Sequence, residues 1–313
     1  MGSTERPPGS LRSRPPEGDQ PTRDGPASAG PAIAPLGVED LSGALALSLS
    51  AHWNQNEADW RTMLALGRGY GIRAQDDDGA TQLAASTVVL PYGEHFAWVS
   101  MVLVLPAFRR RGYASLLLRH ALGGLQREGR AAVLDATPAG HEVYVQEGFT
   151  DTWGFARYRR EARSDGATVS GLTRPLRESD WPAIDALDAP AFGASRIELL
   201  RTLAQRLPVA ARVAEQGGRV TGFVLGRDGR EAAQIGPLIA ADDAVAQHLL
   251  ADVLAALPGP LYLDLLDRRR ALLPWLQAQG FAFQRPFTRM VHGRRDAPGD
   301  AATIVLAAGP ELG

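Results

Sequence analysis

The sequence predicts an α/β (α+β) fold in which one arrangement of strands and helices occurs twice along the chain. Both halves read as one strand, two helices, three strands, a helix, a strand, a helix and a strand. Both also carry a Gly-Phe pair after the last helix, at Gly148 and Gly280, and a Leu-Asp pair in the preceding strand, at Asp135 and Asp264. We interpret this repeat as an internal duplication, with two unrelated α/β domains as the alternative.

Composition divides the chain into four segments. Residues 1–31 contain Leu11 as their only large aliphatic residue, so they bury too little apolar surface to offset the entropy of ordering, and we expect a disordered tail. The globular pattern begins after this tail. Two domains are predicted over 32–160 and 172–313, and the polar stretch 161–171 between them is the predicted linker.

The elements of the first half follow from the spacing of apolar residues and from the turn residues that interrupt it. After Gly112, leucines and alanines fall on one face at helical spacing, whereas 95–105 is continuously apolar and strand-like. Asn54 or Asn56 can cap the second helix. The expected elements are a strand and a helix within 32–50, a helix over 54–66, strands over 69–75, 81–90 and 95–105, the helix after Gly112, a strand over 131–136, a helix over 140–148 and a strand over 149–159.

The second half repeats this outline with its own turn signals. Gly-Gly and Asp-Gly pairs divide the stretch 209–240 into a meander of strands. The remaining expected elements are a strand and a helix within 172–187, helices over 195–207, 242–257 and 269–280, and strands over 261–266 and 281–293.

The composition excludes several classes of function. The chain has no cysteine, which rules out disulfides and thiolate chemistry, and it has no lysine, so its 33 basic residues are all arginine. The formal net charge of −2 argues against a general nucleic-acid binder, and the histidine spacing indicates no metal site. No apolar run approaches the roughly 18 residues that span a bilayer. We therefore expect a soluble, cytoplasmic protein without nucleic-acid, membrane or metal partners.

A cluster of positive charge precedes the helix that begins at Gly112. Arg109, Arg110 and Arg111 can form charge-assisted hydrogen bonds, and the first N–H groups of a helix lack backbone partners. Ala114 and Ser115 keep the first turn of this helix small. The pattern predicts a site for a di- or polyphosphate, and the absence of lysine excludes a Walker-type loop. The alternative is a solvated cationic turn.

The stretch "VLVLPAFRRRGYA" resembles the acetyl-CoA signature of the GNAT acyltransferases, L-x-V-x-P-x-x-R-x-x-G-x-G/A, with Val102 at the usual leucine. The resemblance covers about residues 32–160 and implies, for each half, a mixed, mainly antiparallel twisted sheet flanked by helices. It also implies acetyl-CoA as co-substrate. The pantetheine arm would bind the backbone of Val102, Leu103 and Val104. The phosphates would bind the residues Arg109, Arg110, Arg111, Gly112, Tyr113, Ala114 and Ser115.

A second motif, "LDATPAGHEVYVQEGF", resembles the other cofactor segment of the same family. Tyr144, Gly148 and Phe149 match it, and Thr137 stands where asparagine is common. The resemblance implies that Tyr144 protonates the leaving CoA thiolate and that Thr137 lies against the cofactor. The alternative is that Tyr144 is an ordinary core aromatic residue.

A base that deprotonates the acceptor is not obvious. The strand positions where the family often carries Glu or His are Trp98 and Ser100 here. Glu94 begins the same strand and is our candidate base, acting through water. Further candidates for this role are Glu57, Asp59, His95 and His52. For the acceptor side of the site we expect Asn54, Asp59 and Ser100.

The second half lacks the features that imply cofactor binding. Asp242 and Asp243 stand where phosphates would lie and would repel them, and Leu276 replaces the tyrosine. We expect this copy to be structural or to shape the acceptor site. The segment 280–290 either leans over the first-half cleft or packs as an ordinary strand.

These observations predict an N-acyltransferase that moves an acetyl group from acetyl-CoA to an amine of a small molecule or protein. Two alternatives stay open. One is a non-catalytic CoA-binding sensor or regulatory protein, and the other is an interaction module whose second half binds a partner. The sequence leaves the acceptor and the oligomeric state undetermined.

Overall fold

The computed structural model describes residues 1–3, 31–162 and 169–313. Most of the predicted N-terminal tail and the middle of the predicted linker lie outside these residues. Residues 31–313 form one compact unit. Within the described residues, no helix is long and apolar enough to cross a membrane.

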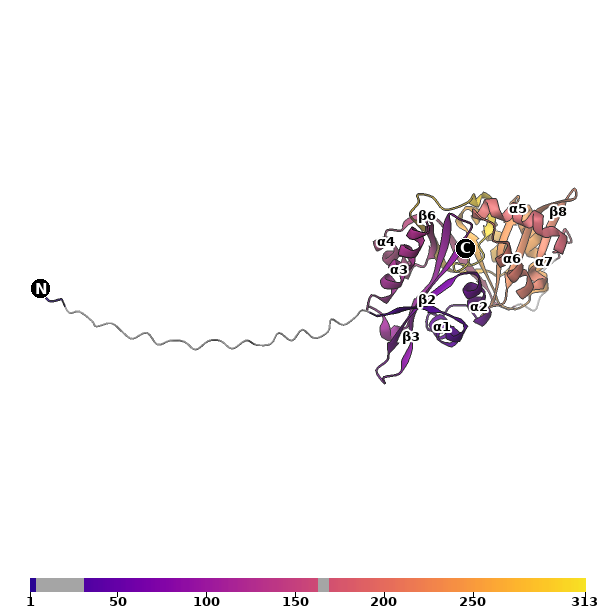
Figure 1. Cartoon of the computed structure of the whole chain (residues 1–313). Helices are drawn as coiled ribbons and strands as arrows, with labels where there is room; N and C mark the ends of the chain where they lie inside the picture. The colour runs from indigo at the N-terminus through magenta and orange to yellow at the C-terminus, as the bar shows by residue number, and fades with distance from the viewer. Residues whose placement is uncertain (4–30, 163–168) are drawn as a thin grey trace. The chain divides into compact units, whose positions relative to one another are not determined.

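The first half contains the ten elements that the sequence predicts, in the predicted order (Figure 1). Its helix α2 begins at a capping box, in which the Asn56 side chain accepts from the backbone N–H of Asp59 and the Asp59 carboxylate accepts from that of Asn56. The elements are β1 Ile33–Leu36, α1 Leu41–Ser50, α2 Glu57–Leu66, β2 Arg68–Gln75, β3 Thr81–Tyr92, β4 Phe96–Val104, α3 Tyr113–Arg127, β5 Ala131–Ala136, α4 Pro138–Gln146 and β6 Thr150–Arg160.

The second half repeats the order and adds one strand that the sequence did not predict. The added strand, β13, is followed by a buried segment that ends at Gly313. The elements are β7 Thr173–Pro175, α5 Trp181–Phe192, α6 Ile197–Arg206, β8 Arg212–Gln216, β9 Arg219–Arg227, β10 Ala233–Ala240, α7 Asp243–Ala256, β11 Leu261–Leu266, α8 Leu273–Ala278, β12 Ala282–His292 and β13 Ile304–Leu306.

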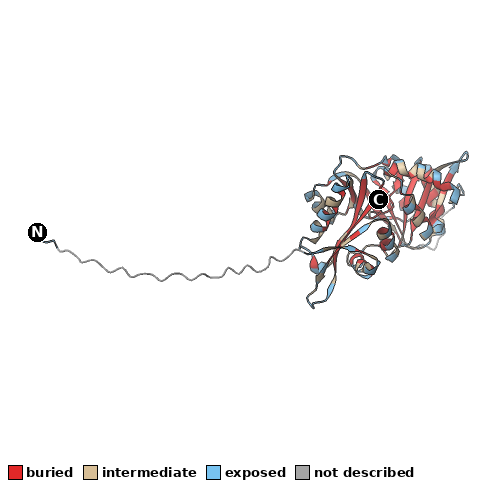
Figure 2. Cartoon of the chain, in the orientation of Figure 1, coloured by how far each residue is buried: buried red, intermediate tan, exposed pale blue. Residues whose placement is uncertain are grey.

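All thirteen strands join one mixed sheet in the order β1-β2-β3-β4-β5-β12-β6-β11-β13-β10-β9-β8-β7. Most neighbours are antiparallel, and the parallel pairs are β4 with β5 and β10 with β11. This confirms the predicted fold class. Figure 2 shows that the strands are largely buried, while exposed residues gather on the helices and turns.

The two halves exchange the strands β6 and β12. The second-half strand β12 lies between β5 and β6 of the first half, and β6 pairs in turn with β11 of the second half. Each half therefore completes the sheet of the other. This exchange explains why the segment 280–290 both packs as a strand and reaches the first half.

Two buried ion pairs join the halves at equivalent places. Arg289 of β12 forms a bidentate pair with Asp135 of β5, at 2.9 and 3.0 Å, and Arg157 of β6 forms one with Asp264 of β11, at 2.8 and 2.7 Å. Both arginines are the eighth residue of their strand, and each lies directly opposite its aspartate in the register. The aspartates belong to the repeated Leu-Asp pairs, so the repeat in the sequence marks these contacts.

A separate network ties α2 to the second half. The Asp59 carboxylate accepts from Arg227 of β9 at 2.8 Å and from Arg206 of α6 at 2.6 Å. Arg227 also donates to the carbonyl of Ala308 at 2.6 Å and pairs with Glu311. Arg227 therefore connects the segment after β13 to Asp59 of α2.

The Arg289 pair gives a prediction about stability. Arg289→Met leaves the buried Asp135 carboxylate without a counter-charge, which should lower the free energy of unfolding by about 3–5 kcal/mol. The double variant Arg289→Met with Asp135→Asn should recover part of this loss. Guanidinium unfolding curves measure the effect. The control is Arg61→Met, which breaks an exposed pair with Glu57 and should leave the curve unchanged. Equal curves for Arg289→Met and Arg61→Met would contradict the prediction.

Candidate functional site

The site begins where β4 and β5 separate. These parallel strands pair only from Phe96 to Trp98, opposite Ala131 to Val133, although both strands continue further. Beyond Trp98, the edge of β4 that faces β5 presents backbone groups with no strand partner among the described residues. A β4 edge opened in this way can bind an extended chain by backbone hydrogen bonds.

A bulge bends β4 at this opening. Met101 has a positive φ of 50°, and the register with β3 shifts between Ser86 and Val88. Two hydroxyl groups of β3 hold the bulge, because Ser86 donates to the carbonyl of Met101 at 2.8 Å and Thr87 donates to that of Ser100 at 3.3 Å. The sequence analysis did not anticipate this bulge, since nothing in the apolar run marks it.

The arginine turn leads into the exposed start of α3. Gly112 is the N-cap residue at φ 77°, and no side chain caps the helix. A Cβ at Gly112 would meet nothing within 4 Å, so the approach to the helix N-terminus is open. Arg109 and Arg111 donate to the carbonyls of Val104 and Ala107, whereas Arg110 is exposed at φ 63°. The uncapped N–H groups and these charges favour an anion.

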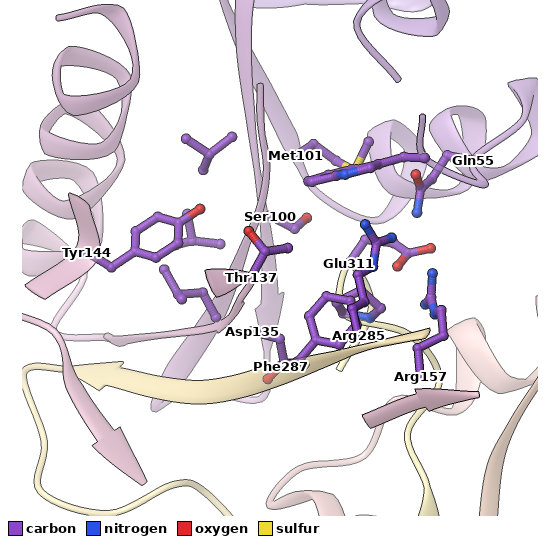
Figure 3. A pocket seen from close by; sticks show the side chains of 15 residues that line it. Gln55, Ser100, Met101, Asp135, Thr137, Tyr144, Arg157, Arg285, Phe287 and Glu311 are labelled. Atoms are coloured by element: carbon purple, nitrogen blue, oxygen red, sulfur yellow. The ribbon is translucent and has the colours of Figure 1, made fainter. Parts of the chain in front are cut away.

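The second motif lies across the opening on α4. Thr137 is the N-cap of this helix, and its hydroxyl accepts from the N–H of Gly140 at 3.3 Å. Tyr144 packs edge-on against Phe149, and its hydroxyl points into the space between β4 and α4 (Figure 3). Burial raises the pKa of Tyr144 to about 12, so the phenol keeps its proton at neutral pH.

A narrow cleft extends from Tyr144 toward the second half (Figure 3). Both halves line it, since the walls include residues of β4, β6, β12 and the segment after β13. The lining residues are Trp53, Gln55, Val99, Ser100, Met101, Val102, Leu134, Asp135, Thr137, Tyr144, Arg157, Arg285, Phe287, Pro310 and Glu311.

The structure brings some of the predicted site residues together. Ser100, Val102, Thr137 and Tyr144 all line the cleft, and the turn from Arg109 to Ser115 opens at the end of the same strand, β4. Leu103 and Val104 continue the open edge of β4.

Glu94, Asn54 and Asp59 are not among the residues that line the cleft. Glu94 is exposed in the turn before β4. The Asn54 side chain bonds the backbone of Glu231 and Ala232. The Asp59 carboxylate is committed to the ion network described above. Asn54 and Asp59 thus join the halves instead of lining the acceptor side.

Trp98, one of the strand positions where the family often carries a base, contacts the second half. The Trp98 indole N–H donates to the carbonyl of Pro310 at 3.0 Å, and Arg289 stacks on the Trp98 ring at 4.4 Å. Tyr92 of β3 donates to the carbonyl of Leu312 at 2.8 Å. These bonds anchor the segment that carries Glu311.

The sequence did not predict the polar cleft residues that lie outside the two Arg–Asp pairs, namely Gln55, Arg285 and Glu311. They come from the α1–α2 connection, from β12 and from the segment after β13. No motif links them, because only the exchanged strands and the buried C-terminal segment bring them to one place. Burial lowers the pKa of Arg285, and the nearby positive charge of Arg157 lowers it further.

The corresponding place in the second half is closed to an anion. The Asp242 carboxylate caps α7 by accepting from the N–H of Val245 at 2.8 Å, and Asp243 pairs with Arg269 at 2.9 Å. Leu276 of α8 is fully buried. The helix N-terminus that would face a phosphate is therefore occupied by a carboxylate of the chain itself. Across the described ranges, no group of His, Asp and Glu residues is arranged to hold a metal ion.

Two family models match the chain, one in each half. Residues 46–149 match the acetyltransferase (GNAT) family, and residues 184–305 match an acetyltransferase (GNAT) domain. Among curated proteins, the uncharacterized N-acetyltransferase YitH of Bacillus subtilis (strain 168) is 24% identical over 248 residues, which are 79% of this chain and 86% of that protein.

Solved structures share the fold over most of the chain. A proposed acetyltransferase of Pyrococcus horikoshii aligns with a TM-score of 0.74 at 19% identity, covering 93% of this chain and 99% of that one. A tandem GNAT protein from the clavulanic acid biosynthesis pathway aligns with a TM-score of 0.60 at 16% identity, covering 85% and 99%. The element order, the opened edge of β4 and the two family matches together place this chain in the GNAT acetyltransferase family, as a protein with two tandem GNAT domains.

Proposed function

We propose that this protein transfers the acetyl group of acetyl-CoA to a primary amine. The proposal assigns the chemistry to the half that spans residues 32–160 and a supporting role to the half that spans 172–313. The observation that carries it is the opening between β4 and β5, with an uncapped helix N-terminus at one end and the Tyr144 phenol at its side. The family membership supports the same reaction class.

The cofactor would bind along this opening. The pyrophosphate fits the N–H groups at the start of α3 together with the arginines at 109–111, since both favour negative charge. The pantetheine arm fits the open backbone edge of β4 from Val99 to Val104, which can pair with its amides as a strand would. The thioester would then lie near the bulge at Met101, between Ser100 and Tyr144.

The reaction needs one bond made and one broken. The neutral amine nitrogen attacks the thioester carbonyl, the C–N bond forms, the C–S bond breaks, and Tyr144 gives its proton to the departing thiolate and recovers one from solvent. The acceptor ammonium loses a proton to water before attack, and the attacking amine loses its second proton afterwards. Holding the two reactants in one narrow cleft supplies much of the rate.

One observation favours a second function, a CoA-binding sensor without turnover. The strand positions where a base was sought hold Trp98 and Ser100, and Trp98 is bonded to Pro310. Measured release of CoA thiol in the presence of amines separates the two functions, because a sensor binds acetyl-CoA and releases none.

The helix N-terminus can be tested by calorimetry with acetyl-CoA. We expect one site per chain, and Gly112→Trp should weaken binding by at least about 10-fold, because the indole covers N–H groups whose bonds to phosphate are charge-assisted. Gly79→Trp is the matched control, since Gly79 also has a positive φ and open space around its Cβ but lies in the β2–β3 turn. Two sites per chain, or equal affinity of both variants, would refute the assignment.

The role of Tyr144 can be tested by Tyr144→Phe. Loss of the proton donor should lower kcat by about 100-fold or more and leave the dissociation constant of acetyl-CoA within a few-fold, because the ring that packs on Phe149 is kept. Thiol release under saturating acetyl-CoA measures kcat, and calorimetry measures binding. An unchanged kcat would make Tyr144 a packing residue.

The raised pKa of Tyr144 predicts the alkaline side of the pH profile. An ordinary phenol loses its proton around pH 10, whereas this one holds it until the pH approaches about 12. The acid must be protonated to act, so kcat should show no descending limb between about pH 8 and pH 10. A limb centred near pH 10 in the wild type and absent from Tyr144→Phe would contradict the shift.

A further inference from the structure

Three buried oxygen atoms in the cleft have no hydrogen-bond partner in the described protein. They are Gln55 Oε1, Ser100 Oγ and Glu311 Oε2, and all three residues are at least nine-tenths buried. Buried polar atoms are normally paired, so three of them in one cleft indicate a polar ligand. Figure 3 shows these side chains reaching toward the same space from separate segments.

The chemistry of this trio suits an ammonium group. An amide oxygen and a carboxylate oxygen accept hydrogen bonds, and a hydroxyl can accept one as well, while an alkyl ammonium has three N–H bonds to donate. A substrate with only apolar groups would leave all three oxygen atoms without a hydrogen bond, and each unpaired atom costs free energy. The other oxygen of Glu311 pairs with Arg227, which orients the carboxylate toward the cleft.

The network of ion pairs that contains Glu311 has more negative than positive groups. Asp59, Asp228 and Glu311 are three carboxylates, and the arginines that pair with them are two, Arg206 and Arg227. This connected network therefore carries one excess negative charge, and Glu311 is its member in the cleft. A bound ammonium would neutralise it.

A positive charge lies in the same cleft. Arg285 forms no close ion pair among the described residues, although Asp264 and Glu311 attract it at longer range. Its Nε is buried without a hydrogen bond, and its guanidinium lies over the Phe287 ring at 5.3 Å. The other arginine of the lining, Arg157, is taken by Asp264. A guanidinium in this state favours a carboxylate or a phosphate, which can bind it in two places.

We propose that the acceptor is a small amine that also carries an acidic group, with its ammonium bound by Gln55, Ser100 and Glu311 and its carboxylate or phosphate bound by Arg285. This inference rests on the proposed acetyl transfer and adds the class of acceptor. It gives the second half a direct part in the site, since Arg285 and Glu311 both come from it. Both halves thus contribute residues to the proposed acceptor site, whereas only the first half would bind the cofactor.

The test uses the full chain with acetyl-CoA and matched pairs of amines. Glycine, β-alanine, γ-aminobutyrate and L-phenylalanine are compared with their carboxamides, and aminoethyl phosphate is compared with ethanolamine. Thiol release gives kcat/KM, and mass spectrometry identifies the product. We expect at least one acidic amine to exceed its neutral partner by about 10-fold or more, which is the value of one charge-assisted pair. The carboxylate and phosphate arms distinguish the two kinds of acid.

Two variants locate the preference. Arg285→Met should reduce the ratio of acidic to neutral amine to within a few-fold, whereas Arg294→Met, which removes an exposed arginine beyond β12, should keep it. Glu311→Gln keeps the shape of the side chain and removes its charge, so it should raise KM for the amine by about 10-fold or more and leave acetyl-CoA affinity unchanged. Circular dichroism melting confirms that each variant is folded.

Each outcome decides between the two proposals. If acetyl-CoA fails to bind, the proposed function is wrong. If acetyl-CoA binds and neutral amines react as well as acidic ones, or if Arg285→Met keeps the preference, the acceptor inference is wrong and the proposed function stands. Binding of acetyl-CoA with no acidic amine acetylated also overturns the acceptor inference.

Discussion

Two buried arginine–aspartate pairs determine how this molecule is assembled. Arg289 of β12 pairs with Asp135 of β5, and Arg157 of β6 pairs with Asp264 of β11, so each pair joins one half to the other. Burying four charges is costly unless every pair has good geometry, and here both pairs are bidentate and directly opposed in the sheet. A shifted register would leave buried charges unpaired, so these contacts specify which strands become neighbours. The single sheet of thirteen strands follows from that choice.

The same arrangement of strands also forms the cleft. Because β12 occupies the place beside β5, its residues Arg285 and Phe287 lie where they can line the opening that β4 and β5 leave. The network around Arg227 then holds the segment after β13, which supplies Glu311. In the second half, Asp242 caps the N-terminus of α7, and residues of this half line the cleft of the first half.

Much of the fold could be predicted from local sequence patterns, and the parts that could not be predicted depend on contacts between distant residues. The order of helices and strands could be predicted because periodicity and caps act between near neighbours, as at Asn56 and Asp59. The cofactor candidates from Val102 to Ser115 form one contiguous motif. By contrast, periodicity does not tell which distant strand lies alongside, so the exchange of β6 and β12 was not anticipated. Periodicity likewise does not tell which side chains of β4 and its flanking turn face the cleft, and Glu94 does not line it.

The strand exchange also governs the order in which the molecule can be completed. The first half contains the whole proposed cofactor segment, yet the place between β5 and β6 is filled only after β12 has been synthesised. Residues more than a hundred positions apart must meet before either ion pair forms, which is a slow kind of contact to make. A nascent chain therefore presents open sheet edges until translation has passed β12, and its cleft gains Glu311 later still. Chains that stop before β12 keep these sheet edges open, which favours aggregation.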